Sequence, residues 1–97
     1  MKEERYYYVY LLASKRNGTL YIGVTSNLAD RIDKHKQGIY DGFTKKYKVD
    51  KLVYCEVYND VRDAINREKQ LKNWQRKWKI ELVEKENSTW RDLYNEI

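Results

Sequence analysis

Two runs of β-forming residues on either side of an Asn-Gly pair constrain the start of this chain most strongly. Residues 6–13 (YYYVYLLA) are aromatic, β-branched and aliphatic, and residues 19–25 (TLYIGVT) have a similar character. Asn17 and Gly18 lie between these runs, and both residue types tolerate a positive φ, which favours a tight hairpin turn. The sequence therefore predicts two antiparallel strands that pair through a short hairpin.

The alternation of side chains along these strands gives the first indication of function. With the turn centred on the Asn-Gly pair, position n would face position 35 − n, so Tyr10 and Tyr21 would share one sheet face with Gly23. The opposite face would be apolar and would carry Leu11, Leu20, Ile22 and Val24. Phenols beside a glycine suggest a surface that another molecule approaches closely, although half-buried tyrosines are also ordinary strand residues.

The rest of the chain predicts a third strand and several helices. In order, these are a helix from Ser26 or Asn27 to about Gln37, a strand at 52–58, a helix from Asn59 or Asp60 to about Asn73, a helix at 75–86, and a short last helix after Ser88 or Thr89 that carries Trp90, Leu93 and Ile97. Residues 39–50 have no clean period, and we expect a basic loop with a buried Phe43. The order β-β-α-β-α-α predicts an α+β fold: a small three-stranded antiparallel sheet flanked by helices, in one domain over residues 1–97.

Composition excludes several classes of protein. The chain has no apolar run near the ~18 residues of a membrane span and no leader of the secretory type, so we expect neither a membrane nor a secreted protein. The single cysteine, Cys55, cannot form an internal disulfide, and the sequence has no cluster with zinc-ligand spacing. We therefore expect a fold held by packing alone, in a reducing cytoplasm.

Positive charge is concentrated in the middle of the chain. Residues 31–79 carry fourteen basic and seven acidic groups, whereas residues 80–97 carry two basic and five acidic groups. A basic block of this kind suits a polyanionic partner, and the ten tyrosines and three tryptophans could stack on bases. Modest basicity without a specific partner is the alternative.

Three polar residues form a second candidate group. Arg31 and His35 are four residues apart on a predicted helix, so they project from the same face, where a guanidinium can bind phosphate and an imidazole can move a proton. Glu68 is an isolated acid among basic neighbours. It could form a plain intrahelical ion pair or bind a metal ion.

Taken together, these residues resemble the GIY-YIG nuclease superfamily, in its small single-domain type. The first half-motif is Tyr8-Val9-Tyr10 and the second is Tyr21-Ile22-Gly23, with Arg31 ten positions after Tyr21 and His35 four positions later. The family's metal-binding glutamate is matched by Glu68, and its late asparagine by Asn87. The chain departs from the family at Tyr8, in place of a glycine, at Val24, where some members have lysine, and at Ser88, in place of a common proline.

The resemblance implies a role for each matched residue. Tyr10, Tyr21, Arg31 and His35 would be catalytic, Glu68 would bind Mg²⁺ or Mn²⁺, and Gly23 and Asn87 would be structural or would position substrate. We take Tyr21 as the base that activates water, with Tyr10 placing the same water or supporting Tyr21, and we keep Tyr10 and His35 as alternative bases. Tyr40 or Tyr47 could contact substrate. Nucleic-acid binding would involve a set of basic residues: Lys45, Lys46, Lys69, Lys72 and Arg76.

The function implied by the resemblance is a divalent-metal-dependent endonuclease. It would hydrolyse DNA, leave a 5′-phosphate and a 3′-hydroxyl, and act in DNA repair or processing. A nucleic-acid-binding module that has kept the fold without catalysis is the alternative, and a small basic RNA-associated protein is a third hypothesis. No separate DNA-binding domain is recognisable, so a protein partner could supply target specificity, and the sequence leaves the oligomeric state open.

Overall fold

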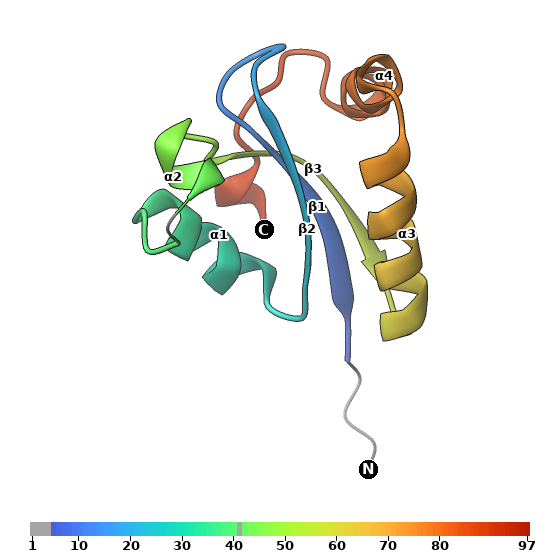
Figure 1. The fold of residues 1–97 in the computed structure, drawn as a ribbon. Helices are drawn as coiled ribbons and strands as arrows, with labels where there is room; N and C mark the ends of the chain where they lie inside the picture. The colour runs from blue at the N-terminus through green and yellow to red at the C-terminus, as the bar shows by residue number, and fades with distance from the viewer. Residues whose placement is uncertain (1–4, 41) are drawn as a thin grey trace.

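The fold is built around a three-stranded antiparallel sheet whose central strand is the first in the sequence. In the computed structural model, which describes residues 5–40 and 42–97, the strands are β1 (Tyr7–Ala13), β2 (Leu20–Thr25) and β3 (Lys51–Tyr58), in the order β2-β1-β3 (Figure 1). β1 pairs antiparallel with both neighbours. The predicted α+β class and the small antiparallel sheet are confirmed.

The hairpin register differs from the prediction by two residues. Tyr10 lies opposite Gly23, so position n faces position 33 − n. The reason is local, because Asn17 alone takes a positive φ of 55° and the Gly18 N–H donates to the Lys15 carbonyl oxygen at 2.9 Å. The turn is therefore centred one residue earlier than the Asn-Gly pair. Because a shift of two residues restores the same side-chain direction, the predicted division of the two sheet faces is confirmed.

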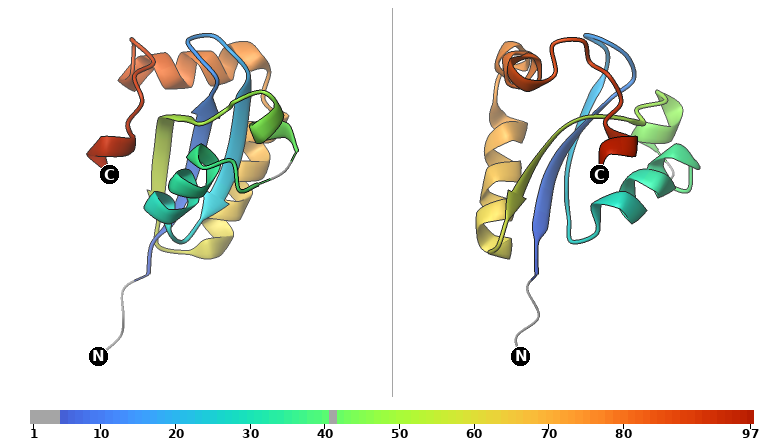
Figure 2. Two further views of the ribbon diagram at one scale, coloured as in Figure 1. Left: turned by 90° about the vertical axis from the view of Figure 1, so that its left-hand side faces the viewer. Right: turned by 180° about the vertical axis from the view of Figure 1, so that it is seen from behind.

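The main helices cover opposite faces of the sheet. α1 (Leu28–Lys36) lies on one face and α3 (Val61–Asn73) on the other, as Figure 2 shows, and α4 (Arg76–Glu86) packs at one end. Of the caps left open by the sequence, Asn27 and Asp60 are the ones used. The Asn27 side chain accepts from the Asp30 N–H, and the Asp60 side chain accepts from the Arg62 N–H.

The predicted basic loop at 39–50 contains a short helix, and the prediction of a buried Phe43 is wrong. α2 (Phe43–Lys46) begins at Phe43, whose side chain is 47% exposed, whereas Thr44 is buried. A single helical turn buries only one face, and here the hydroxyl side chain faces inward toward a polar partner, described below. Asp41, in the same predicted loop, lies outside the described residues.

The C-terminal segment also differs from the prediction. In place of a helix after Ser88 or Thr89, the chain turns at Trp90, which has a φ of 58°, and forms only a short 3₁₀ turn, η1 (Tyr94–Glu96). The Leu93 N–H donates to the Leu52 carbonyl oxygen at 2.8 Å, so the segment crosses the end of the sheet and returns to the α1 face (Figure 2). Packing against β3 has replaced the helix that side-chain spacing favoured.

Two small cores lie on the two sides of the sheet. The first, between the sheet and α3, includes Val9, Leu11 and Leu71. The second, between the sheet and α1, includes Tyr10, Leu12 and Ile32. Tyr10 is therefore the polar member of an otherwise apolar core, and its hydroxyl needs a partner inside the protein. In the part of the chain that the structure describes, every helix is too short or too polar to cross a membrane.

Candidate active site

A hollow of about 300 Å³ lies between the edge strand β2, α1 and the segment that contains α2. Six side chains line it: Tyr21, Arg31, His35, Tyr40, Phe43 and Thr44. Three of them were predicted as catalytic from the sequence, and Tyr40 was predicted as a substrate contact. The fold therefore brings these six side chains, which lie between positions 21 and 44 in the sequence, around one hollow.

Gly23 allows two phenols to occupy the same side of the hairpin. Tyr10 lies directly across from Gly23, and a Cβ atom added to Gly23 would come within 2.3 Å of the Tyr10 hydroxyl oxygen and 2.4 Å of its Cζ. With no side chain at Gly23, the Tyr10 ring lies across the backbone of β2, and its centroid is 6.3 Å from that of Tyr21. The glycine of the second half-motif thus makes space for the tyrosine of the first.

Tyr10 is buried and holds its proton. Its exposed fraction is 0%, and burial, with a smaller contribution from Tyr21, raises the pKa of the Tyr10 phenol well above its usual range, although Arg31 acts in the opposite direction. The hydroxyl lies 3.3 Å from Nε2 of His35. A buried phenol that keeps its proton donates it to an acceptor, and this nitrogen fills that role.

His35 lies between two hydroxyl groups. Nε2 faces Tyr10, and Nδ1 is 3.3 Å from Oγ1 of Thr44. Burial, together with the nearby positive charge of Arg31, lowers the pKa of His35 below its usual range, so the ring is neutral near pH 7. Because Nε2 accepts from Tyr10, we assign the ring proton to Nδ1, which donates to Thr44.

Thr44 is the member of this group that sequence reasoning missed. It follows Phe43 in a segment without hydrophobic period, so no pattern indicated which of its side chains faces inward. A buried threonine nine residues from a histidine carries no recognisable signal. The contact depends on how the segment folds back onto α1.

Arg31 and Tyr40 complete the rim of the hollow. The Arg31 guanidinium carbon is 5.5 Å from the Tyr40 ring centroid, a cation–π arrangement, and the same ring is 4.7 Å from that of His35. Tyr21 contributes the other side, with its ring centroid 5.5 Å from that of His35. The guanidinium and the half-buried Tyr21 phenol therefore border one space.

Glu68 belongs to a different helix. It extends from α3 with a side chain that is 15% exposed, and Nζ of Lys72 is 3.2 Å from its carboxylate. Arg31 reaches toward α3 across the edge of β2, because Arg31, Val61 and Ile65 line a common groove of about 270 Å³. Glu68 lies about one turn further along α3 than Ile65. The structure thus brings Tyr10, Tyr21, Arg31 and His35 together at the hollow, whereas Glu68 extends from α3, which covers the other face of the sheet (Figure 2).

Asn87 has structural partners. Its exposed fraction is 2%, and its Nδ2 donates to the carbonyl oxygens of Val53 (3.1 Å) and Arg91 (2.9 Å). Its Oδ1 accepts from the Arg91 N–H at 3.2 Å. Asn87 therefore ties the end of α4 to β3 and to the C-terminal segment.

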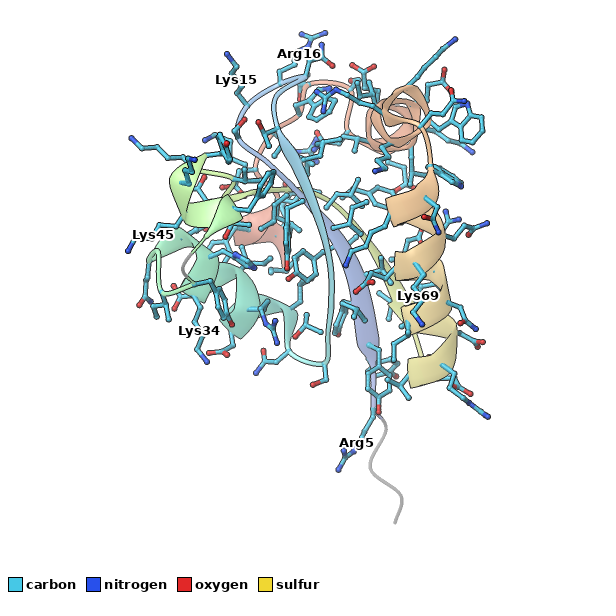
Figure 3. All side chains as sticks on the ribbon, viewed as in Figure 1. Arg5, Lys15, Arg16, Lys34, Lys45 and Lys69 are labelled. Carbon is cyan, nitrogen blue, oxygen red and sulfur yellow. The ribbon has the colours of Figure 1, made fainter. Side chains whose placement is uncertain are left out.

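The predicted nucleic-acid contacts lie on three helices. Lys45 and Lys46 are exposed on α2, and Lys69 is exposed on α3. Lys45 and Lys69 project on opposite sides of the sheet (Figure 3). Lys72 is paired with Glu68. Arg76 donates to the backbone carbonyl oxygens of Asn17 (2.7 Å) and Gly18 (2.6 Å), so it also joins α4 to the hairpin.

The fold and the clustered side chains together define a small single-sheet α+β domain with a hollow lined by aromatic and basic side chains. The model of the GIY-YIG catalytic domain matches residues 6–81, which span all three strands, α1, α2 and α3, and the chain belongs to the GIY-YIG family. The resemblance inferred from the half-motifs is confirmed.

Relatives of similar size support this assignment. The chain is 35% identical over 78 residues to a UPF0213 protein of Staphylococcus haemolyticus, covering 80% of this chain and 94% of that protein. It is 38% identical over 76 residues to a UPF0213 protein of Clostridium perfringens, with 78% and 81% covered. The solution NMR structure of a UPF0213 protein from Bacillus halodurans is similar with a TM-score of 0.56 and 26% identity, over 90% of this chain and 92% of that one.

Proposed function

We propose that this protein is a divalent-metal-dependent endonuclease that hydrolyses DNA phosphodiester bonds to a 5′-phosphate and a 3′-hydroxyl, in DNA repair or processing. The observation that carries the proposal is the convergence of Tyr21, Arg31 and His35 on one hollow. Family membership supports a nuclease, and the basic central block supports a nucleic-acid substrate. The single cysteine is consistent with a reducing compartment such as the cytoplasm.

Arg31 would bind the scissile phosphate. Cleavage adds negative charge to the phosphate in the transition state, and a guanidinium at the rim of the hollow can donate two hydrogen bonds to its non-bridging oxygens. Stacking against Tyr40 limits the directions in which Arg31 can point. An arginine restrained in this way loses less conformational entropy when it binds phosphate.

Tyr21 would activate the attacking water. The two nitrogens of His35 are both within hydrogen-bond distance of hydroxyl groups, whereas Tyr21 is half-buried and lines the hollow. His35 and the buried Tyr10 would then fix the position of the Tyr21 ring. His35 as the base is the alternative, and it would require Tyr10 or Thr44 to release one ring nitrogen.

Glu68 would hold the metal ion. Its carboxylate is a hard oxygen ligand, and Mg²⁺ and Mn²⁺ commonly bind proteins through one or two carboxylates while keeping several waters. Among the described residues no three His, Cys, Asp or Glu side chains gather in a cluster that could hold a metal, so an ion bound here would rely on Glu68, water and substrate phosphate. When bound, the ion supplies a Lewis acid that stabilises negative charge on the phosphate and the leaving oxygen.

A nucleic-acid-binding module without catalysis is the second candidate. It is favoured by the ion pair between Lys72 and Glu68, because a carboxylate that is neutralised in this way needs no metal ion. Both hypotheses predict binding to nucleic acid. They differ in the role of Glu68, which binds the catalytic metal ion in the first hypothesis and only forms an ion pair within α3 in the second. A substitution of Glu68 therefore separates them.

The decisive experiment compares Glu68→Ala with wild type on single-stranded, nicked, flapped and duplex DNA, with and without Mg²⁺ or Mn²⁺. Cleavage by the mutant should fall by orders of magnitude, because the leaving oxygen loses its Lewis acid. Affinity for DNA in EDTA should hold or rise, since a negative charge is removed from a basic helix. Stability should change little, because alanine is a good helix former.

Glu81→Ala provides the matched control. Glu81 is an exposed acid on α4, so its loss changes the net charge equally without touching the candidate metal ligand. The control should cleave like wild type. Cleavage by Glu68→Ala at the wild-type rate would contradict the metal role, and absence of cleavage in all three proteins would favour the binding module.

A further inference from the structure

The junction of α3 and α4 carries two tryptophans that differ in their surroundings. Trp74, which follows α3, is half-buried and packs against the core between the sheet and α3. Trp78, in the first turn of α4, is 46% exposed. The two rings meet edge to face, with centroids 6.1 Å apart and planes at 90°. We call this pair the tryptophan platform.

Folding accounts for only one member of the platform. The residue of α4 that is fully buried is Val83, and this side chain anchors the helix to the core. Trp78 lies on the same helix with almost half of its surface in water. The exposed part of the indole is therefore accessible to another molecule, and its edge-to-face contact with Trp74 gives it a defined orientation.

Arg67 and Glu56 hold the Trp74 ring of the platform in place. The guanidinium carbon of Arg67 is 5.0 Å from the Trp74 ring centroid. Arg67 is itself fixed by two hydrogen bonds to the Glu56 carboxylate, at 2.9 and 3.0 Å. Trp74 in turn supports Trp78 at its edge. A ring that is already oriented loses little freedom when another flat group stacks on it.

The residues around the platform are mainly basic, with one exposed acid, Glu81, one turn after Trp78 on α4. Residues 69–80 contain five lysines and arginines and no acidic residue. Arg76, between the two tryptophans, binds the carbonyl oxygens of the hairpin turn, which places Lys15 and Arg16 at the tip of the hairpin nearby (Figure 3). A nucleic-acid backbone that passes the platform would meet cations from both α4 and the hairpin.

We infer that Trp78, supported by Trp74, is a stacking site for an unpaired base of a single-stranded nucleic acid. An exposed aromatic ring among cations is the combination that binds single strands without sequence preference. Duplex DNA cannot use it in the same way, because its bases are already stacked inside the helix. The inference deepens the proposed function and rests on it in one respect, namely that a bound single strand would lead to the hollow.

The connection to the hollow runs along the hairpin. Gly18, which Arg76 contacts, is three residues before Tyr21, or about 10 Å along an extended strand. A single-stranded arm that passes from the platform along this strand would lead to the hollow. The inferred substrate class is DNA with an unpaired segment next to the cleaved bond.

The test measures binding in EDTA, so that it does not depend on cleavage. Fluorescence anisotropy compares a labelled thymidine oligonucleotide with an abasic oligonucleotide of the same length and charge. Wild type should bind the thymidine oligonucleotide about tenfold more tightly, since a stacked base typically contributes this much. Trp78→Ala should lose the preference, and Trp78→Phe should keep most of it.

Two further variants separate stacking from charge and from folding. Trp78→Lys adds a cation at the same place, so it should bind both oligonucleotides well yet show no preference for bases. Lys77→Ala should weaken binding to both equally. Thermal unfolding of each variant is measured first, and Trp78→Lys tests the same position even if Trp78→Ala proves unstable.

The outcomes distinguish this inference from the proposed function. An unchanged preference in Trp78→Ala and Trp78→Lys, or equal binding of both oligonucleotides by wild type, would overturn the platform. A preference that depends on Trp78 in a protein that cleaves no DNA would support the platform and overturn the endonuclease. Cleavage of flapped DNA that slows more in Trp78→Ala than cleavage of plain duplex would support both.

Discussion

At the scale of single residues, the candidate site depends on one absent side chain and one buried hydroxyl. Gly23 leaves space for the Tyr10 ring, and Thr44 binds the nitrogen of His35 that Tyr10 does not use. Neither residue needs to touch substrate. Both determine where the groups that line the hollow can lie.

Gly23→Ala should destabilise the protein and disturb the site. The added methyl group would meet the Tyr10 ring at 2.3–2.4 Å, so Tyr10 or β2 must move, and overpacking of this kind typically costs about 1–3 kcal/mol. Urea unfolding measures the loss, and Tyr10→Phe, which removes only the hydroxyl group, serves as the comparison. An alanine variant as stable as wild type would show that the ring is not held against Gly23.

Thr44→Val should remove the hydrogen bond between Thr44 and the imidazole of His35 while keeping a side chain of nearly the same volume. The assigned Nδ1–H tautomer then loses its acceptor, and we expect cleavage to fall by about tenfold because the ring no longer has one fixed orientation. His35 is the only histidine in the chain, so its ¹⁵N NMR signals report the tautomer directly.

The conservative variant Thr44→Ser keeps the hydroxyl group and should restore both the tautomer and the rate. Identical ¹⁵N signals in wild type and Thr44→Val would mean that Thr44 does not fix the ring. In wild type, titration should give a pKa for His35 below its usual range, as burial and Arg31 require.

At the scale of secondary-structure elements, β3 and α3 are joined through one carboxylate. Glu56 accepts hydrogen bonds from the Tyr54 hydroxyl (2.5 Å), the Tyr58 hydroxyl (2.7 Å) and the Arg67 guanidinium. Burial alone would raise the pKa of Glu56, but these donors outweigh it and hold the pKa below its usual value of 4.5. The same network orients Arg67 under Trp74, so it connects the sheet with the tryptophan platform.

Glu56→Gln should cost about 2 kcal/mol at neutral pH, because Arg67 and two hydroxyl groups lose a charged acceptor. The pKa of Glu56 is lower in the folded than in the unfolded protein, so its stabilisation is complete above pH 4.5 and is lost as the pH falls through the folded value. Unfolding free energies measured down this range should fall less steeply in the variant. Glu96→Gln, at an exposed ion pair with Arg91, should behave like wild type.

At the scale of the whole molecule, charge is divided between the middle and the end of the chain. The basic block of residues 31–79 includes most of α1, all of α2, β3 and α3, and the first turn of α4, and the acidic residues of 80–97 follow it. In three dimensions the hairpin brings Lys15 and Arg16 close to the start of α4. The basic surface therefore includes residues that the sequence alone places outside the block.

Binding to DNA should weaken steeply with salt. If about four to six phosphates are neutralised, the logarithm of the association constant should fall with the logarithm of salt concentration at a slope of about −3 to −5, because bound counterions are released. Titrations in EDTA at several salt concentrations give this slope. A flat response would exclude nucleic acid as the substrate.

The sequence by itself determined the features that depend on neighbouring residues. Strand character within residues 6–13 and 19–25, a cap at Ser26 or Asn27 and another at Asn59 or Asp60, and the shared sheet face of Tyr10 and Tyr21 were predicted from side-chain character and spacing alone. The structure bears these out and selects Asn27 and Asp60. The half-motifs and the spacing of Arg31 and His35 then predicted four residues that do converge. The strands and caps are local features that side-chain period and capping can predict, whereas the convergence of the four residues was implied by the resemblance to the GIY-YIG family.

Only the tertiary structure decided the contacts that join segments without a regular period. Thr44 reaches His35 because the segment around α2 folds back onto α1, and Trp90 takes a positive φ because the C-terminal segment packs against β3 instead of forming a helix. The exposure of Trp78 likewise depends on Val83 being the side chain that anchors α4. In these segments local preferences are weak or conflicting, so the conformation is set by the free energy of burial and hydrogen bonding between residues distant in sequence.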